Sequence, residues 1–192
     1  MIWLEYLENI NTSFNIQILK KNDSIIITHI LQETQLVIIL DGLVQIIKIF
    51  TNGEGLCTNL LKANNIIQLN HPKTKHVNYY YKATAITKTA IANIPMQELT
   101  KKTSKTQQSI KKFIKLNIYN HASYNIMIHI LCHKSTKKRI IQLLLILSKE
   151  FGQSQQKHII IPFYLSHNTI SIITGSHRVN ITRIMNELKK KK

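Results

Sequence analysis

Short runs rich in apolar residues fill the first half of the chain, and turn residues separate them. The runs are rich in β-branched side chains, which favour strands, and they cover residues 24–30, 35–40, 43–50, 56–61, 66–69, 78–86 and 89–94. Asp41-Gly42 predicts a two-residue hairpin turn, and the next turn is expected at 52–55. Many short strands at this spacing predict a barrel or a jelly roll, with a purely structural β-sandwich as the alternative.

The periodicity becomes helical after Pro95, with a short helix expected at 96–103 and a long one at 104–134. One stripe of the long helix repeats at alternating spacings of four and three residues, and we call its members the seam positions. They are Ile110, Ile114, Asn117, His121, Tyr124, Ile128 and Leu131. Three such heptads favour a two-stranded coiled coil, in which the polar seam residues Asn117 and His121 fix the register. The alternative is an amphipathic helix packed on its own β domain.

A third helix is expected at 137–151, and its apolar residues lie on nearly every side. Such a helix must be well buried. Gly152 is predicted to end it. A polar loop at 153–157 and a short strand at 158–161 are expected to follow, with Pro162 closing the strand.

Residues 165–188 have the pattern of two helices joined by a tight turn. Ser166 is predicted to cap a first helix that runs to Thr174, with Ile170 and Ile173 on its buried face. Gly175 suits a turn that needs a positive φ. This pattern predicts a DNA-reading helix-turn-helix, and the alternative is an ordinary helical hairpin whose arginines face water.

Ser176 is predicted to cap the second helix, which extends over 176–188. Either Val179 or Ile181, together with Ile184 and Leu188, is expected on its core side. A small residue is needed where the two helices cross, and Ser171 meets that need. The chain therefore divides into a β domain at 1–103, a dimerisation helix at 104–134 and a helix-turn-helix domain at 135–192.

Positive charge is concentrated in the second half of the chain. The formal net charge is +17, and residues 101–192 hold eighteen Lys or Arg against Glu150 and Glu187 alone. Residues 1–100 hold eight lysines and seven acidic residues. A half of the chain with such an excess of positive charge attracts polyanions, but it also attracts anionic membrane surfaces. Charge alone therefore does not distinguish these two kinds of partner.

Other chemistry is sparse. Two cysteines are too few for a disulfide scaffold and indicate a reducing compartment, and the start of the chain lacks a signal peptide. The longest apolar run of the basic half, 143–147, is far too short for a bilayer, so a soluble protein is expected. No phosphate loop, nucleophile elbow or carboxylate pair beside a histidine is present, and no enzyme is predicted.

Two residue clusters have weaker functional interpretations. His129, Cys132 and His133 could converge on a metal from one helix, but three ligands without a fourth favour a helix face that merely carries them, so no metal site is predicted. Among three successive tyrosines, Tyr79 and Tyr81 share one face of a strand, and core packing is preferred to a stacking platform.

The order of β-roll, dimer helix, buried helix, short strand and helix-turn-helix resembles the CRP/FNR family of transcription regulators. The likeness is strongest in residues 139–152 and 165–183 and is greatest to nitrogen-control regulators of the NtcA type and their plastid-encoded relatives. It implies an α+β fold: a β-roll like that of cyclic-nucleotide-binding domains, a long dimerisation helix and a C-terminal helix-turn-helix. The implied partners are double-stranded DNA, a second copy of the chain and RNA polymerase, and no membrane is implied.

The resemblance also assigns roles to residues of the motif. Arg178, Val179 and Arg183 correspond to residues that read base edges in the major groove. Val179 in particular implies a palindrome with GTA and TAC half-sites. Positions that hold phosphates and set the register are matched by Ser166, Asn168, Ser176, His177 and Thr182.

The chain departs from the resemblance at the effector site. NtcA-type proteins bind 2-oxoglutarate with arginines and a glutamate, but the matching positions fall at 67–70 and near Tyr79, Asn120 and Asn125. A dicarboxylate needs compensating cations, so no cofactor is predicted and the effector is unknown.

The C-terminal wing hairpin of the family is also not found. An alternative function is therefore an interaction or effector-binding module that has lost regulated DNA binding. A plastid stroma is the implied location, in keeping with the heavy use of Ile, Asn and Lys that is typical of AT-rich genomes.

Overall fold

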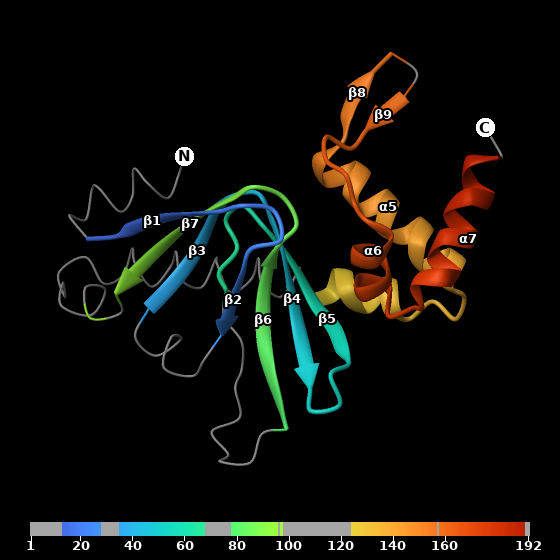
Figure 1. Cartoon of the computed structure of the whole chain (residues 1–192). Helices are drawn as coiled ribbons and strands as arrows, with labels where there is room; N and C mark the ends of the chain where they lie inside the picture. The colour runs from blue at the N-terminus through green and yellow to red at the C-terminus, as the bar shows by residue number, and fades with distance from the viewer. Residues whose placement is uncertain are drawn as a thin grey trace. The chain divides into compact units, whose positions relative to one another are not determined.

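The computed structural model describes residues 13–27, 35–67, 78–95, 97, 124–156 and 158–190. The chain divides into two compact units, Met1–Tyr124 and Asn125–Lys192, and each has its own buried core (Figure 1). The predicted helix at 96–103 and the predicted long helix up to residue 123 lie outside the described residues, apart from residue 97. The first four seam positions, 110–121, fall there as well.

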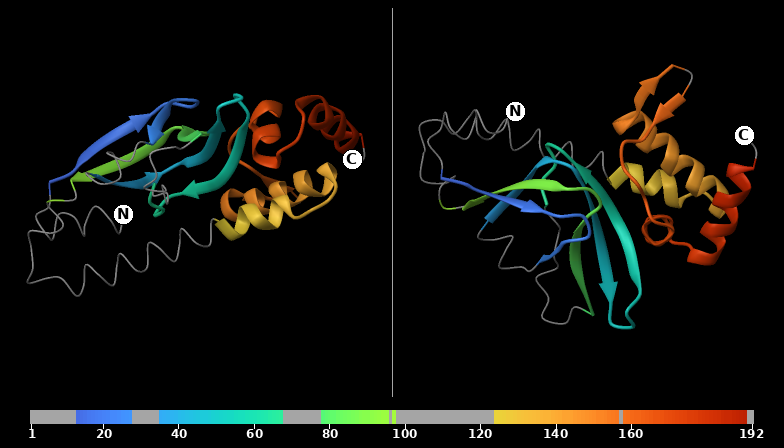
Figure 2. Two further views of the ribbon diagram at one scale, coloured as in Figure 1. Left: turned by 90° about the horizontal axis from the view of Figure 1, so that it is seen from below. Right: turned by 45° about the horizontal axis from the view of Figure 1, so that its top comes forward.

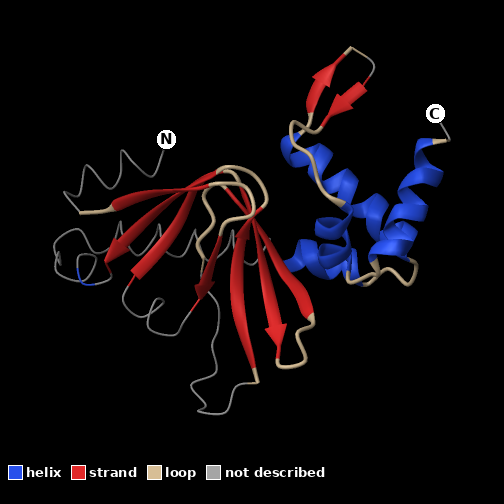
Figure 3. Ribbon diagram, in the orientation of Figure 1, coloured by secondary structure: helices blue, strands red, loops and turns tan. Residues whose placement is uncertain are grey.

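Seven strands in two antiparallel sheets build the described part of the first unit (Figure 3). They are β1 (Asn15–Leu19), β2 (Ser24–Ile27), β3 (Gln35–Asp41), β4 (Leu43–Phe50), β5 (Gly55–Lys62), β6 (Tyr79–Ala85) and β7 (Thr89–Pro95). One sheet has the order β1-β7-β3, and the other has the order β2-β6-β4-β5. The predicted strands are confirmed to within a few residues where the structure describes them, except at 66–69, where Ile66 forms an isolated bridge to Ile38.

The core of this unit is formed by inward-facing side chains from both sheets. On the larger sheet, Ile46 lies opposite Ala83 and Val44 opposite Ala85, so a large side chain is matched by a small one across the ladder. The buried cluster consists of Leu19, Ile27, Val37, Ile39, Val44, Ile46, Leu61, Ile67, Ala83, Ala85 and Ile91. Within the cluster, the members from β3 and from β4 are two positions apart and so share one face of their strand, although their neighbours in these strands are buried too.

The predicted hairpin at Asp41-Gly42 is wrong. Strands β3 and β4 follow one another directly in the chain but do not pair, because β3 pairs with β7 and β4 pairs with β5 and β6. The chain changes sheets at Gly42, which has a φ of +99°. The turn at 52–55 is confirmed, since the amide of Phe50 donates to the carbonyl oxygen of Glu54 at 2.9 Å and joins β4 to β5.

The second unit contains a described helical segment at 124–131 and the helices α5 (Thr136–Phe151), α6 (His167–Thr174) and α7 (Arg178–Lys189). A small hairpin of β8 (Gln153–Gln155) and β9 (His158–Ile160) lies between α5 and α6 in the chain. The core of the second unit consists of Met127, Ile130, Ile140, Leu143, Leu147, Ile170, Ile173, Ile181 and Ile184. None of the helices in the described part of the chain combines the length and the hydropathy needed to span a bilayer.

Three expectations for this unit need correction. Residues 153–155 form a strand paired with β9 and not a loop, because the backbone of this polar segment finds its partners in the neighbouring strand. Helix α5 is buried along one stripe only, since Leu145 is 60 % exposed. The helix that was expected to reach residue 134 ends at Leu131, and Ser135 caps α5 by accepting from the amide of Lys138.

Candidate nucleic-acid interface

The turn between α6 and α7 has the predicted geometry. Ser166 caps α6, because its Oγ accepts from the amide of Thr169 at 3.0 Å. Gly175 ends α6 in the left-handed region with a φ of +57°. The amide of Ser176 then donates to the carbonyl oxygen of Ser171 at 3.0 Å, and Ser171 is buried at the crossing as expected. The predicted helix-turn-helix is therefore present.

The start of α7 differs from the prediction. The helix begins at Arg178, and its N-cap residue is His177, which makes no side-chain capping bond. Ser176 does not cap α7, because it lies one residue before the N-cap, and its Oγ donates to the carbonyl oxygen of Thr174 at 3.2 Å, on the preceding helix. Ser176 and His177 are adjacent, and a local pattern does not determine which of them precedes the first helical residue.

One face of α7 is open to solvent. Ile181 and Ile184 are buried against the rest of the unit, which settles the alternative between Val179 and Ile181 for the core side. Val179 is 79 % exposed, and Arg183 is exposed four residues further on. Figure 1 and Figure 2 show α7 beside α6 in each view.

The exposed face extends over residues 179, 183 and 186, with the half-buried Thr182 at its edge, because positions three and four apart lie on the same side of a helix. Arg178 is also exposed, at the first turn of α7. Arg178, Val179 and Arg183, the three residues predicted to read base edges, are therefore all at the surface of α7 near its N-terminal half. An apolar side chain exposed between two arginines is suited to contact an apolar group on a polyanion.

The residues predicted to hold phosphates lie around this helix pair. Ser166 and Asn168 are at the start of α6, with Ser166 half-buried and Asn168 exposed. His177 is exposed just before α7, whereas Thr182 is half-buried on it. Thr182 contacts His167, a residue that sequence reasoning did not select, with 3.0 Å between Oγ1 and Nδ1.

Arg139, on α5, makes hydrogen bonds that hold the turn between α6 and α7. Its Nε donates to the carbonyl oxygen of His133 at 2.8 Å, and its Nη1 donates to that of Thr174 at 3.0 Å. The guanidinium thereby satisfies carbonyl groups at the C-terminal end of α6, where a cation is also favoured by the helix dipole. A salt bridge of 2.6 Å between Lys137 and Glu187 links α5 to α7. Glu187 is thus paired, which leaves the charge of α7 dominated by its cations.

Two other candidate sites, a possible metal cluster and the buried cysteine, have less support in the structure. No three His, Cys, Asp or Glu side chains converge in a way that could hold a metal among the residues that the structure describes. His129 and Cys132 do not share a helix, because the helix ends at Leu131. Burial raises the pKa of the Cys57 thiol to about 12, so this thiol stays protonated and unreactive.

The tyrosines lie as the alternation predicts. The rings of Tyr79 and Tyr81 contact edge to face at 5.5 Å, and Tyr80 points to the other side of the strand and is exposed. Lys48 Nζ lies 3.6 Å from the centroid of the Tyr79 ring, so a cation that sequence reasoning overlooked is held against this pair. Burial raises the pKa of Tyr81, and the neighbouring Tyr79 adds to this effect.

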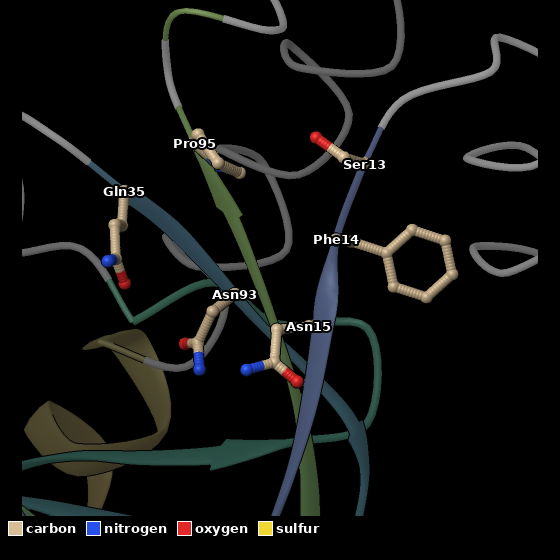
Figure 4. Close-up of a pocket in the computed structure, with 6 residues that line it drawn as sticks. All are labelled: Ser13, Phe14, Asn15, Gln35, Asn93 and Pro95. Carbon is tan, nitrogen blue, oxygen red and sulfur yellow. The ribbon is translucent and has the colours of Figure 1, made fainter.

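A hollow of about 330 Å³ opens at one end of the smaller sheet (Figure 4). It is lined by Ser13, Phe14, Asn15, Gln35, Asn93 and Pro95. The amide groups of Asn15 and Asn93 lie on the same side of β1, and the ring of Phe14 points away from them. These residues offer hydrogen bonds but no charge, so the hollow does not match a site for a dicarboxylate.

Comparison with known proteins supports the interpretation of the second unit. No family model matches the chain. The chain is 29 % identical over 191 residues to the protein of Porphyra purpurea named HTH-type transcriptional regulator ycf28, covering 97 % of this chain and 76 % of that protein. It is 25 % identical over 156 residues to the global nitrogen regulator of Synechococcus elongatus, covering 81 % of this chain and 70 % of the relative.

Solved structures match the fold across both units. A cyclic nucleotide-binding domain containing protein of Listeria monocytogenes has a TM-score of 0.75 at 14 % identity and covers 99 % of this chain and 90 % of its own. A CRP/FNR-family transcriptional regulator of Thermus thermophilus has a TM-score of 0.64 at 18 % identity, covering 92 % and 87 %. The chain is therefore a homologue of HTH-type transcriptional regulators, and it has the fold of the CRP/FNR family.

Proposed function

We propose that the chain is a sequence-specific DNA-binding transcriptional regulator that reads the major groove with α7. The observation that carries this proposal is the exposed face of α7, where Val179 is 79 % exposed and Arg178 and Arg183 are exposed beside it. An arginine can donate two hydrogen bonds to guanine O6 and N7, and a valine methyl can contact the thymine methyl. Each good contact of this kind contributes about 1 to 3 kcal/mol of discrimination.

Groups around α7 would set its position on the duplex without reading sequence. The candidates for phosphate contacts are Ser166, Asn168, Ser176, His177 and Thr182, which come from the start of α6, the turn and α7. Lys189 and Lys190 add positive charge at the C-terminal end of α7. Contacts of this type account for the salt dependence of DNA binding.

The regulator is proposed to act as a homodimer on a palindrome. Ile128 supports this arrangement, because it occupies a seam position of the heptad pattern and is 56 % exposed in the single chain. Two copies of α7 about 34 Å apart would then meet successive major grooves on one face of the duplex, at GTA and TAC half-sites. RNA polymerase is the partner that such a regulator would meet at a promoter.

Nitrogen control in a plastid is the context that the named relatives support. The chain is not proposed to use 2-oxoglutarate. Tyr79 stands where the effector site has an arginine, and the cation beside it, Lys48 Nζ, lies 3.6 Å from the centroid of its ring. Asn125 is an exposed neutral residue. Binding to DNA is therefore expected to be the same with and without that dicarboxylate.

The test begins with selection of bound sites from a random DNA pool, with and without 2-oxoglutarate. One palindromic site is expected under both conditions. A ratio of affinities for the selected site and random DNA that stays near one would contradict the proposal and favour a module that has lost specific binding. A site enriched only with 2-oxoglutarate would contradict the proposed independence from this effector.

Substitutions then separate base reading from phosphate contact. Arg183→Ala is expected to relax the preference at one base position and to lower discrimination by about 1 to 3 kcal/mol, because the guanidinium is lost. Lys189→Ala is the matched control on the same helix and should weaken binding to all sequences alike. It should also reduce, by about one, the slope of the logarithm of the binding constant against the logarithm of the salt concentration. Both variants are measured by titration on the selected site and on random DNA over a range of salt. Equal losses on the two DNAs for Arg183→Ala would contradict base reading by this residue.

A further inference from the structure

His167 joins the two helices on the side where α7 is exposed. It is the first residue of α6 and is half-buried, and its Nδ1 lies 3.0 Å from Thr182 Oγ1 on α7. Thr182 follows Val179 by three positions, so it lies on the same face of the helix. His167 therefore sits at the edge of the proposed interface, although the motif pattern assigned it no role.

The hydrogen-bond network assigns the proton on the imidazole. Thr182 Oγ1 donates its one proton to the carbonyl oxygen of Arg178 at 3.1 Å. The hydroxyl can then only accept from His167, so Nδ1 of the ring carries a proton. Nε2 is left as the nitrogen that can meet an outside partner, and in the neutral ring it is an acceptor.

A phosphate oxygen is also an acceptor, so a neutral ring held in this way cannot bind it. A second proton on Nε2 converts the ring into a cation that donates to the phosphate. A bound polyanion favours the second proton, because its field stabilises positive charge.

The charged residues on the helices packed against α6 are mostly basic. Helix α7 carries Arg178, Arg183, Glu187 and Lys189, and α5 carries Lys137, Lys138, Arg139, Lys149 and Glu150. Of the two acidic residues, Glu187 is bonded to Lys137 at 2.6 Å, and Glu150 is exposed near the far end of α5. His177 lies at the N-cap of α7, and His129 and His133 lie in the segment before α5.

We propose that His167 takes up a proton from solvent when DNA binds and donates from Nε2 to a backbone phosphate. The inference rests on the proposed DNA-binding function and adds to it a dependence of affinity on pH. Thr182 acts as the positioning residue, because its hydroxyl orients the ring so that Nε2 faces outwards. Affinity is expected to fall as pH rises across the range in which histidine loses its charge.

The test uses the full chain and the selected duplex at constant salt. Affinity is measured from pH 5.5 to 8.5, and proton uptake is measured by calorimetry in two buffers with different heats of ionisation. About one proton per protomer is expected, with affinity falling by up to about tenfold per pH unit over the titration. His167→Gln should abolish the uptake and flatten the pH dependence while the preferred base sequence stays the same. Circular dichroism of each variant verifies that it folds.

His158→Gln is the matched control, because it removes an exposed histidine on β9 that has no proposed role in DNA binding and leaves His167 in place. Proton uptake that survives in His167→Gln, or that disappears in His158→Gln, would overturn the role of His167 and leave DNA reading untouched. Equal binding of selected and random duplexes would instead count against the proposed function, while uptake measured on random DNA still decides the role of His167. A chain that binds neither duplex would overturn both.

Discussion

Arg139 connects the segment just before α5 to the end of α6, which lies 35 residues further along the chain. Its guanidinium bonds to the carbonyl oxygens of His133, before α5, and of Thr174, at the end of α6. Gly175 lies 3.5 Å away through its own carbonyl oxygen. The planar fork of an arginine fits such divergent acceptors, whereas the single ammonium of a lysine does not. The side chain thus holds the turn in which α7 begins.

Loss of this fork should destabilise the second unit. Arg139→Ala is expected to lower the free energy of unfolding by about 2 kcal/mol or more, because hydrogen bonds from a charged group are lost and half-buried carbonyls are left unpaired. Urea denaturation followed by circular dichroism measures the change. Lys138→Ala, at an exposed neighbour, is the control and should stay within about 0.5 kcal/mol of the parent. Equal stability of the two variants would show that the fork contributes nothing.

The junction between β3 and β4 depends on one glycine. Gly42 has a φ of +99°, and a Cβ built on it would lie 2.5 Å from Thr89 Oγ1 and 2.7 Å from the carbonyl oxygen of Lys88. Thr89 is fully buried, so its side chain has no room to withdraw. The crossing from one sheet to the other therefore requires both the left-handed backbone and the missing side chain.

Gly42→Ala should destabilise the first unit more than the same change in an open turn. We expect a loss of about 3 kcal/mol, from the unfavourable φ together with the overlap at Thr89 and Lys88. Gly53→Ala is the matched control, because Gly53 has a φ of +80° but nothing within 4 Å of its built Cβ. It should cost only about 1 to 2 kcal/mol for the backbone. Thermal and urea unfolding of both variants gives the comparison, and equal losses would contradict the role of the close contact.

Assembly is the property on which the proposed palindrome depends. Ile128 is 56 % exposed, and the described neighbours on the same predicted seam are the half-buried Tyr124 and Leu131. Apolar seam residues that are exposed in one chain become buried when two helices pair. A dimer would also bring two basic halves to one duplex, which raises affinity through an effective concentration effect.

Ile128→Asp should separate the two copies without unfolding either. A charge placed in a paired seam is desolvated without a partner, so sedimentation equilibrium is expected to give the mass of one chain for this variant and of two for the parent. Leu145→Asp is the control, since Leu145 is 60 % exposed on α5 and lies outside the seam. It should remain a dimer. A parent protein that sediments as one chain at micromolar concentration would contradict the proposed assembly.

Short-range patterns were enough to predict most of the elements that the structure describes, and the surface position of the arginines in its candidate site. Ser166 as a cap, Gly175 in the turn and the exposure of Arg178 and Arg183 follow from spacing within a few residues, because caps, left-handed turns and helix faces are set locally. The concentration of charge in the second half is likewise a property of the sequence alone.

Long-range partners were decided by the tertiary structure. The pairing of β3 with β7, the contact of Arg139 with Thr174 and that of His167 with Thr182 join residues whose separation in the chain carries no periodic signal. A hairpin signal at Asp41-Gly42 specifies a turn, but which strand each neighbour pairs with depends on how both sheets bury their apolar faces. The start of α7 was likewise decided by the tertiary structure, because Ser176 lies before the N-cap and its hydroxyl donates to the carbonyl oxygen of Thr174.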